Sequence, residues 1–151
     1  MALEVGKKAP AFSLPDEDGK TVKLADFKGK KLVVFFYPKA NTSGCTREAC
    51  DFRDELAVFK KKKAAVVGIS KDTPAAQKKW KEKYKLPFPL LSDPETEVLQ
   101  AWGAWGEKVM YGKKITGTIR TTVLVDEDGK VEKVFSKVKV DGHVASVLEA
   151  L

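Results

Sequence analysis

A βαβ pattern occupies the first half of the chain. Residues 32–37 form a run of bulky apolar side chains that stops at Pro38, as expected of a buried strand. From about 44 to 62 the apolar residues recur at spacings of three and four, which predicts a helix, and 64–70 is a second apolar run typical of a strand. Because strands joined by a helix of this length lie parallel, we expect both in one sheet with a right-handed crossover.

The rest of the chain gives further strand and helix signals. Thr73-Pro74 and Asp93-Pro94 each place a capping residue before a proline, which is the pattern of a helix start. Turn residues between short apolar runs predict an N-terminal hairpin and a second hairpin. The additional predicted elements are strands at 12–14, 21–24, 121–125 and 131–136 and helices at 73–84, 93–102 and 142–150. The pattern predicts an α/β fold in which helices flank a central mixed β-sheet.

Length and composition indicate one globular unit. A chain of 151 residues can bury a core without disulfides, so we expect 1–151 to be a single domain. No apolar run approaches the ~20 residues of a membrane helix, and residues 1–8 carry no apolar signal region. We therefore expect a cytoplasmic protein with no membrane partner. Two cysteines in a reducing compartment are more often catalytic or redox-sensing than structural.

The net charge of +7 does not indicate a nucleic-acid partner. Only three of the 28 basic residues are arginines, and the lysines are spread over predicted helix faces and turns. Their largest run, 60–63, lies where the cysteine-bearing helix ends, and cations there complement the carbonyl end of the helix dipole. No basic patch with interleaved aromatic residues is defined, so we expect no nucleic-acid binding.

Cys45 lies at the predicted start of the helix in the βαβ unit. Unpaired backbone N–H groups and the helix dipole favour an anion there, and so favour the thiolate over the thiol. Arg120 precedes an apolar strand, where a charge is costly unless it has a partner. Glu48, three residues after Cys45, shares nearly the same helix face and can orient an arginine. The chain is expected to keep one thiolate ready to react.

The sequence around this cysteine resembles a known signature. Pro38-x-x-x-Thr42-x-x-Cys45, between a strand and a helix, is similar to the peroxidatic-cysteine motif of the peroxiredoxins. Cys50, followed by Asp-Phe-Arg-Asp, resembles the peroxiredoxin Q (bacterioferritin comigratory protein) subfamily. Ser43 departs from the subfamily, which usually has proline there. Further matches, in the family's order and over nearly the whole chain, lie at 68–74, 86–93, 105–108 and 117–122.

The resemblance implies a thioredoxin-like fold and a thiol-dependent peroxidase that acts on hydrogen peroxide and organic hydroperoxides. It implies that the Cys45 thiolate becomes a sulfenic acid and that a thioredoxin-like reductant regenerates the enzyme. We expect no metal and no cofactor, and a monomer. The expected catalytic residues are Cys45, Cys50, Thr42, Arg120 and Pro38, with Gly44 and Glu48 in support.

Cys50 raises a geometric problem. Five residues along a helix give a ~7.5 Å rise, which places the two Cα atoms roughly 8–9 Å apart. A disulfide needs about 7 Å or less. If Cys50 resolves the sulfenic acid of Cys45, the first turns of the helix must therefore unwind.

Several assignments have structural alternatives. Cys45 and Cys50 can be small packing residues, Thr42 can be a helix N-cap, and Arg120 can pair with an acid for structure alone. We expect His143 to be exposed rather than a catalytic base. Four side chains at and after the end of the helix predicted at 93–102 can line an apolar rim for alkyl peroxides or pack in the core, and we favour the core. These are Trp102, Trp105, Val109 and Met110.

Other functions share the thiol chemistry. Thiol–disulfide oxidoreductases of the thioredoxin type have a Cys-x-x-Cys motif, whereas four residues separate Cys45 from Cys50 in this chain. A peroxide sensor or chaperone-like protein would use the same oxidation with a conformational change as its output. Structural zinc is not expected, because two cysteines and one distant histidine supply only three soft ligands.

Overall fold

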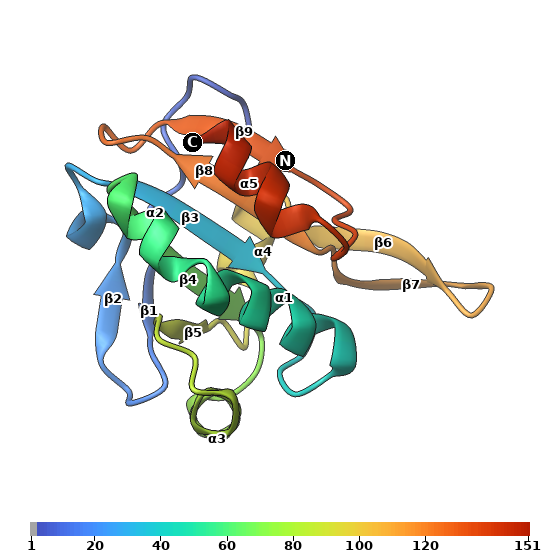
Figure 1. The fold of residues 1–151 in the computed structure, drawn as a ribbon. Helices are drawn as coiled ribbons and strands as arrows, with labels where there is room; N and C mark the ends of the chain where they lie inside the picture. Colours follow the sequence, from blue (N-terminus) through green and yellow to red (C-terminus); the bar gives the residue numbers. More distant parts are fainter. Residues whose placement is uncertain (1–2) are drawn as a thin grey trace.

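A computed structural model describes residues 3–151 and has a five-stranded sheet at its centre (Figure 1). The strand order is β5-β4-β3-β8-β9, and β3 pairs parallel with β4 and antiparallel with β8. The predicted βαβ unit and mixed sheet are thus confirmed. The strands are β3 (Lys31–Phe36), β4 (Ala64–Ser70), β5 (Leu90–Ser92), β8 (Thr121–Val125) and β9 (Val131–Phe135).

Helices cover both faces of this sheet. Successive side chains of the central strand β3 point to opposite faces and are apolar on both, so each face needs a covering layer. Val33 and Phe35 pack with buried residues of α1, α2, α3 and α5, whereas Leu32 and Val34 pack with α4 and the N-terminal segment. Figure 1 shows α1, α2 and α5 together on one face. The helices are α1 (Ser43–Asp54), α2 (Leu56–Lys61), α3 (Pro74–Tyr84), α4 (Glu97–Ala101) and α5 (His143–Ala150).

Two predicted helices differ in the structure. The helix expected at 44–62 breaks at Glu55, which has φ −104° and ψ 7°, so that α1 and α2 are separate helices. The helix expected from residue 93 starts only at Glu97. Its N-cap residue is Thr96, so the N-cap predicted at Asp93 is wrong. Asp93 still contacts the helix start, since its Oδ2 accepts from the backbone N–H of Leu99 at 2.8 Å, and a turn at residues 94–95 lies between them.

Two hairpins lie outside the central sheet. The predicted N-terminal hairpin is confirmed as β1 (Ser13–Pro15) and β2 (Thr21–Lys23), followed by a 3₁₀ turn at Leu24–Phe27. The other one, β6 (Trp105–Met110) with β7 (Lys113–Thr118), was not predicted and projects away from the body (Figure 1). The second predicted hairpin is confirmed as β8 and β9 of the central sheet.

The four side chains that we assigned to the core have different environments. Trp102 is buried and Trp105 is half-buried. The prediction is wrong for Val109 and Met110, which are 70% and 45% exposed. Both lie near the tip of β6, beyond the reach of any covering element.

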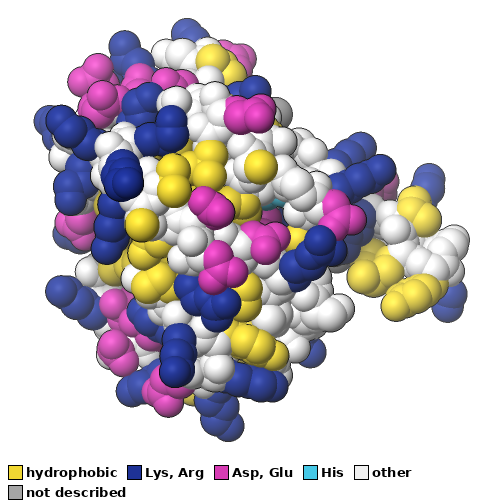
Figure 2. Space-filling view, viewed as in Figure 1, with side chains coloured by type: hydrophobic (Ala, Val, Ile, Leu, Met, Phe, Trp, Pro, Cys, Tyr) yellow, Lys and Arg dark blue, Asp and Glu magenta, His cyan; other side chains and the backbone are white. Residues whose placement is uncertain are grey.

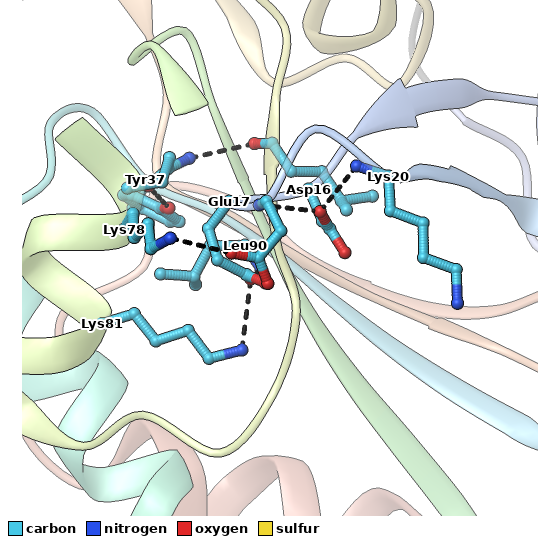
Figure 3. A network of polar contacts seen from close by, with 10 residues as sticks. Asp16, Glu17, Lys20, Tyr37, Lys78, Lys81 and Leu90 are labelled. Carbon is cyan, nitrogen blue, oxygen red and sulfur yellow. Dashed lines mark hydrogen bonds and ion pairs between the residues drawn. The ribbon is translucent and has the colours of Figure 1, made fainter. Parts of the chain in front are cut away.

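The buried carboxylate of Glu17 connects the N-terminal hairpin to α3 and β5 (Figure 3). Glu17 is 8% exposed, and its Oε1 accepts from Lys81 Nζ and from the backbone N–H of Leu90, each at 3.1 Å. Asp16 Oδ1 accepts from the backbone N–H of Lys20 and so closes the hairpin turn. These contacts join the turn to α3 and β5.

Within residues 3–151, none of the helices has the length and apolar character needed to cross a membrane.

Candidate active site

The loop after β3 delivers Cys45 into the first turn of α1. Thr42 is the N-cap residue, and its carbonyl accepts from the N–H of Thr46 at 2.9 Å. The Thr42 side chain does not cap the helix, because its Oγ1 donates to the carbonyl of Lys39 at 2.8 Å. Cys45 is only 1% exposed. The N-cap position predicted for Thr42 is therefore confirmed, without the side-chain bond.

Arg120, in the short link between β7 and β8, contacts Cys45 directly. Its Nη2 lies 3.2 Å from Cys45 Sγ, and its Nη1 donates to Glu48 Oε1 at 2.7 Å. The Arg120 side chain is 17% exposed and that of Glu48 is fully buried. The guanidinium thus holds the sulfur and the carboxylate with two separate nitrogens, as a forked donor can. The structure thus brings Cys45, Arg120 and Glu48 into contact, three of the site residues that the sequence indicated.

Glu48 is a buried carboxyl group with one unpaired oxygen. Its Oε1 accepts from Arg120, whereas Oε2 has no hydrogen-bond partner among the described residues. Burial raises the pKa of Glu48 to about 7, and the charge and hydrogen bond of Arg120 limit the rise. The Glu48 carboxyl group therefore exchanges its proton near neutral pH, next to the thiol.

His143 is buried, which contradicts our expectation of an exposed residue. It is 6% exposed, its Nε2 lies 2.7 Å from Thr122 Oγ1, and the same atom is 3.8 Å from Glu48 Oε2. The rings of Phe52 and Phe135 meet its imidazole edge to face. Burial and the nearby positive charge of Arg120 lower the pKa of His143 to about 4. The start of α5 packs against α1, so a helix terminus that looks exposed in the sequence becomes the back wall of the site.

Gly44 and Pro38 frame the guanidinium and the groove in front of it. A Cβ at Gly44 would lie 3.4 Å from Arg120 Nη2, an ordinary contact distance, so Gly44 lies directly beside the guanidinium. Pro38 and Arg120 line a groove of about 490 Å³ with Lys108, Ile119 and others.

Lys108 of this groove is a residue that the sequence did not indicate as part of the site. Its Nζ donates to the carbonyl of Thr118 at 2.8 Å, and burial lowers the pKa of its ammonium group, which also faces the charge of Arg120.

Cys50 lies further along the same helix and is half-buried against the core. Burial raises the pKa of Cys50, partly offset by the charge of Arg53. Both cysteines are free thiols, and α1 is continuous from Ser43 to Asp54. In this conformation the five-residue helical spacing excludes a disulfide between them.

Comparisons with known proteins identify relatives of the whole chain. The AhpC/TSA family matches residues 5–134. A putative peroxiredoxin of Mycobacterium tuberculosis is 54% identical over 96% of this chain and 92% of its own length. Peroxiredoxin Bcp of Bacillus subtilis is 46% identical over 100% of this chain and 96% of its own. A structure of the bacterioferritin comigratory protein of Xanthomonas campestris, described for its alkyl peroxide reduction activity, has a TM-score of 0.90 at 35% identity and covers 97% of this chain and 96% of its own.

Proposed function

The chain belongs to the AhpC/TSA family and within it to the Bcp/PrxQ peroxiredoxins, which are thiol-dependent peroxidases, and we propose that Cys45 is the thiol that attacks the peroxide. One observation carries the proposal: Arg120 Nη2 lies 3.2 Å from the buried Sγ of Cys45. The arginine thus sets a permanent positive charge and a hydrogen-bond donor beside the sulfur. The thiol-dependent peroxidase acts on a peroxide and is recycled by a thiol reductant.

In the first step the Cys45 thiolate forms a bond to one peroxide oxygen while the O–O bond breaks. Sulfur is oxidised to the sulfenic acid, which keeps the hydroxyl of the attacked oxygen, and the peroxide is reduced. The second oxygen leaves with the electron pair of the O–O bond and takes a proton from solvent. Arg120 donates into the region where this charge develops, and such donors lower the barrier most when they are fixed beforehand. Glu48 fixes Arg120 by holding its other nitrogen.

Three residues of the loop and groove assist this step. Thr42 donates to the carbonyl of Lys39 in the peroxide-free site, and we propose that its hydroxyl turns to donate to a bound peroxide. Pro38 borders the groove and limits the access of water to the sulfur. Gly44 lies beside the guanidinium in the first turn of α1.

Cys50 is the proposed resolving thiol. Its sulfur attacks the sulfenic sulfur of Cys45, a disulfide forms and water leaves. Because wound α1 keeps the two cysteines too far apart, this step needs the first turns of α1 to unwind. A dithiol reductant such as thioredoxin then returns both cysteines to thiols and is itself oxidised to a disulfide.

The lining of the groove bears on which peroxides the enzyme accepts. The groove has apolar walls from Val109, Ile119 and Val138, which suit organic hydroperoxides as well as hydrogen peroxide. The alkyl peroxide activity described for the Xanthomonas campestris relative supports this range. We propose a monomer that works in the cytoplasm.

The decisive test is peroxide consumption with thioredoxin, thioredoxin reductase and NADPH. Wild type should turn over many times, Cys45→Ser should lose activity, and Cys50→Ser should react once and stop. Serine at position 45 supplies no comparable nucleophile at neutral pH. Residual turnover near wild type in Cys45→Ser would remove the assignment. A single stoichiometric oxidation of wild type, without turnover, would favour a peroxide sensor.

A further inference from the structure

The tip of the β6–β7 hairpin carries most of the large apolar side chains that solvent reaches. Of the six exposed ones found within residues 3–151, four lie on this hairpin, with exposures of 38–98%. Figure 2 shows hydrophobic side chains gathered on the part that projects from the body, where Figure 1 places β6 and β7. An apolar cluster kept in water on a projecting element marks a surface that meets a partner. The four residues are Val109, Met110, Tyr111 and Ile115.

Tyr111 occupies a backbone position that disfavours it. It has φ 52° and is followed by Gly112 with φ 77°, so both central residues of the two-residue turn are left-handed. Asn, Asp and Gly are the residues that suit this turn, whereas a bulky aromatic residue is disfavoured. The Tyr111 side chain is 98% exposed and so gains no packing within the chain to offset that cost. A rigid exposed aromatic ring is, however, the usual anchor of a protein interface.

The charges of the hairpin indicate the partner's surface. In the register of β6 and β7, Met110 faces Lys113 and Val109 faces Lys114, so each apolar residue near the tip lies opposite a lysine. The hairpin has three lysines against the single acid Glu107. A complementary surface is apolar with acidic side chains around it. A symmetric tip-to-tip contact with a second copy of this chain would instead set these lysines against the same lysines, between two chains of +7 net charge.

The hairpin also borders the active-site groove. Lys108 and Val109 line the same groove as Arg120. Tyr111 is three residues beyond Lys108, which is about 10 Å along a strand. A protein of ordinary interface size covers about 800 Å² per partner, a patch of about 16 Å radius. A protein whose interface is centred on the groove therefore reaches the tip as well.

We infer that the hairpin tip, formed by Met110, Tyr111, Lys113 and Lys114, is the docking surface for the dithiol protein that reduces the Cys45–Cys50 disulfide. This inference rests on the proposed function and adds the surface through which the reductant is recognised. One thiolate of the docked protein attacks the disulfide and forms a mixed disulfide. Its second thiol then displaces the remaining cysteine, so that the enzyme regains two thiols and the partner leaves as a disulfide.

The first test replaces the aromatic anchor without disturbing the turn. Tyr111→Asn suits the left-handed position better than tyrosine does, so the hairpin keeps its fold. We expect at least a fivefold rise in the KM for thioredoxin, with peroxide turnover driven by dithiothreitol unchanged within twofold. Val5→Ser is the matched control, because Val5 is 66% exposed on the N-terminal segment. It should leave both measurements unchanged.

The second test reverses the charge of the tip. Lys113→Glu with Lys114→Glu should raise the KM for thioredoxin at least fivefold and weaken its dependence on salt. Lys7→Glu with Lys8→Glu changes the net charge equally, at two exposed neighbouring lysines elsewhere, and should have little effect.

Several outcomes overturn the inference. The inference fails if the KM for thioredoxin is unchanged in both hairpin variants. It also fails if the wild-type enzyme turns over with dithiothreitol but does not turn over with thioredoxin. Equal losses with both reductants would mean that the hairpin acts in the peroxide chemistry. A dimer, or binding to anionic vesicles, that Tyr111→Asn abolishes without changing the KM would assign the tip to those occupants. Wild type that consumes no peroxide with either reductant refutes the proposed function itself.

Discussion

Arg120 Nη2 lies 3.2 Å from Cys45 Sγ, although the two residues are 75 positions apart in the chain. Arg120 immediately precedes β8, and Cys45 lies in the helix that follows β3. The antiparallel pairing of β3 with β8, which sets Phe36 opposite Thr121, brings these two ends together. The contact between the guanidinium and the thiol therefore depends on the register of the central sheet.

Replacement of Arg120 should slow the reaction of Cys45 with peroxide even when the thiol is fully ionised. We expect Arg120→Ala to lower the second-order rate of sulfenic acid formation by about 10²–10³, because it removes a fixed donor to the transition state. Stopped-flow oxidation at pH 7 and pH 10 measures this. Arg53→Ala is the control, since Arg53 donates to the carbonyl of Tyr84 and does not contact the sulfur. Full recovery at pH 10 would limit Arg120 to favouring the thiolate.

The second cysteine should act after the peroxide step. Cys50→Ser should form the sulfenic acid at near wild-type rate and then persist or oxidise further to the sulfinic acid. In oxidised wild type, peptide mapping should find a Cys45–Cys50 link, and hydrogen exchange should report lost protection over residues 43–52. A disulfide with the helix still protected, or normal recycling of Cys50→Ser by thioredoxin, contradicts this mechanism.

Glu48 should make stability fall as pH rises through the weakly acidic range. Its folded pKa of about 7, raised mainly by burial, lies above the ordinary value of 4.5. Between these values the folded state holds the proton and the unfolded state does not, so folded stability decreases by up to about 3 kcal/mol. Urea unfolding of wild type and Glu48→Gln from pH 4.5 to 7.5 measures the difference. A constant difference between the two proteins would show that Glu48 does not titrate there.

His143 should remain neutral well below its ordinary pKa. Burial and the charge of Arg120 depress its pKa to about 4 from 6.5, so its contribution to stability is present above pH 6.5 and is lost as pH falls toward 4. It is the only histidine, so its ring proton signals in an NMR titration are unambiguous. We expect no shift of these signals between pH 8 and about pH 5.5. A midpoint near 6.5 would mean that the ring is solvated.

The elements that the sequence predicts best have local causes. Thr73 caps α3 by accepting from the N–H of Ala76 at 3.2 Å, and Pro74 follows at the first helical position, so the helix start was predictable to the residue. The strand at 64–70 is confirmed with the same bounds because its apolar run is continuous. Neither feature depends on distant parts of the chain.

The missed features depend on tertiary packing or on interrupted patterns. His143 is buried only because α5 lies against α1, and no pattern near His143 reports that contact. The β6–β7 hairpin has lysines and glycines within its strands, which hide the alternation of a strand. The dipeptide Tyr111-Gly112 between the two strands was the one local sign of its turn. Arg120 could be expected to need a partner, but only the resemblance to the peroxiredoxins pointed to the sulfur.

The break at Glu55 sets a limit to the proposed unwinding of α1. Helix–coil transitions are cooperative along an uninterrupted run of backbone hydrogen bonds, and they stop where that run is interrupted. Glu55 ends α1 after twelve residues, and α2 begins again with its own first turn. Phe59, fully buried beyond the break, would keep its place in the core if the proposed Cys45–Cys50 rearrangement unwinds α1. The proposed redox transition would then be confined to a segment that can refold in the time of helix formation, microseconds, rather than in that of the whole domain.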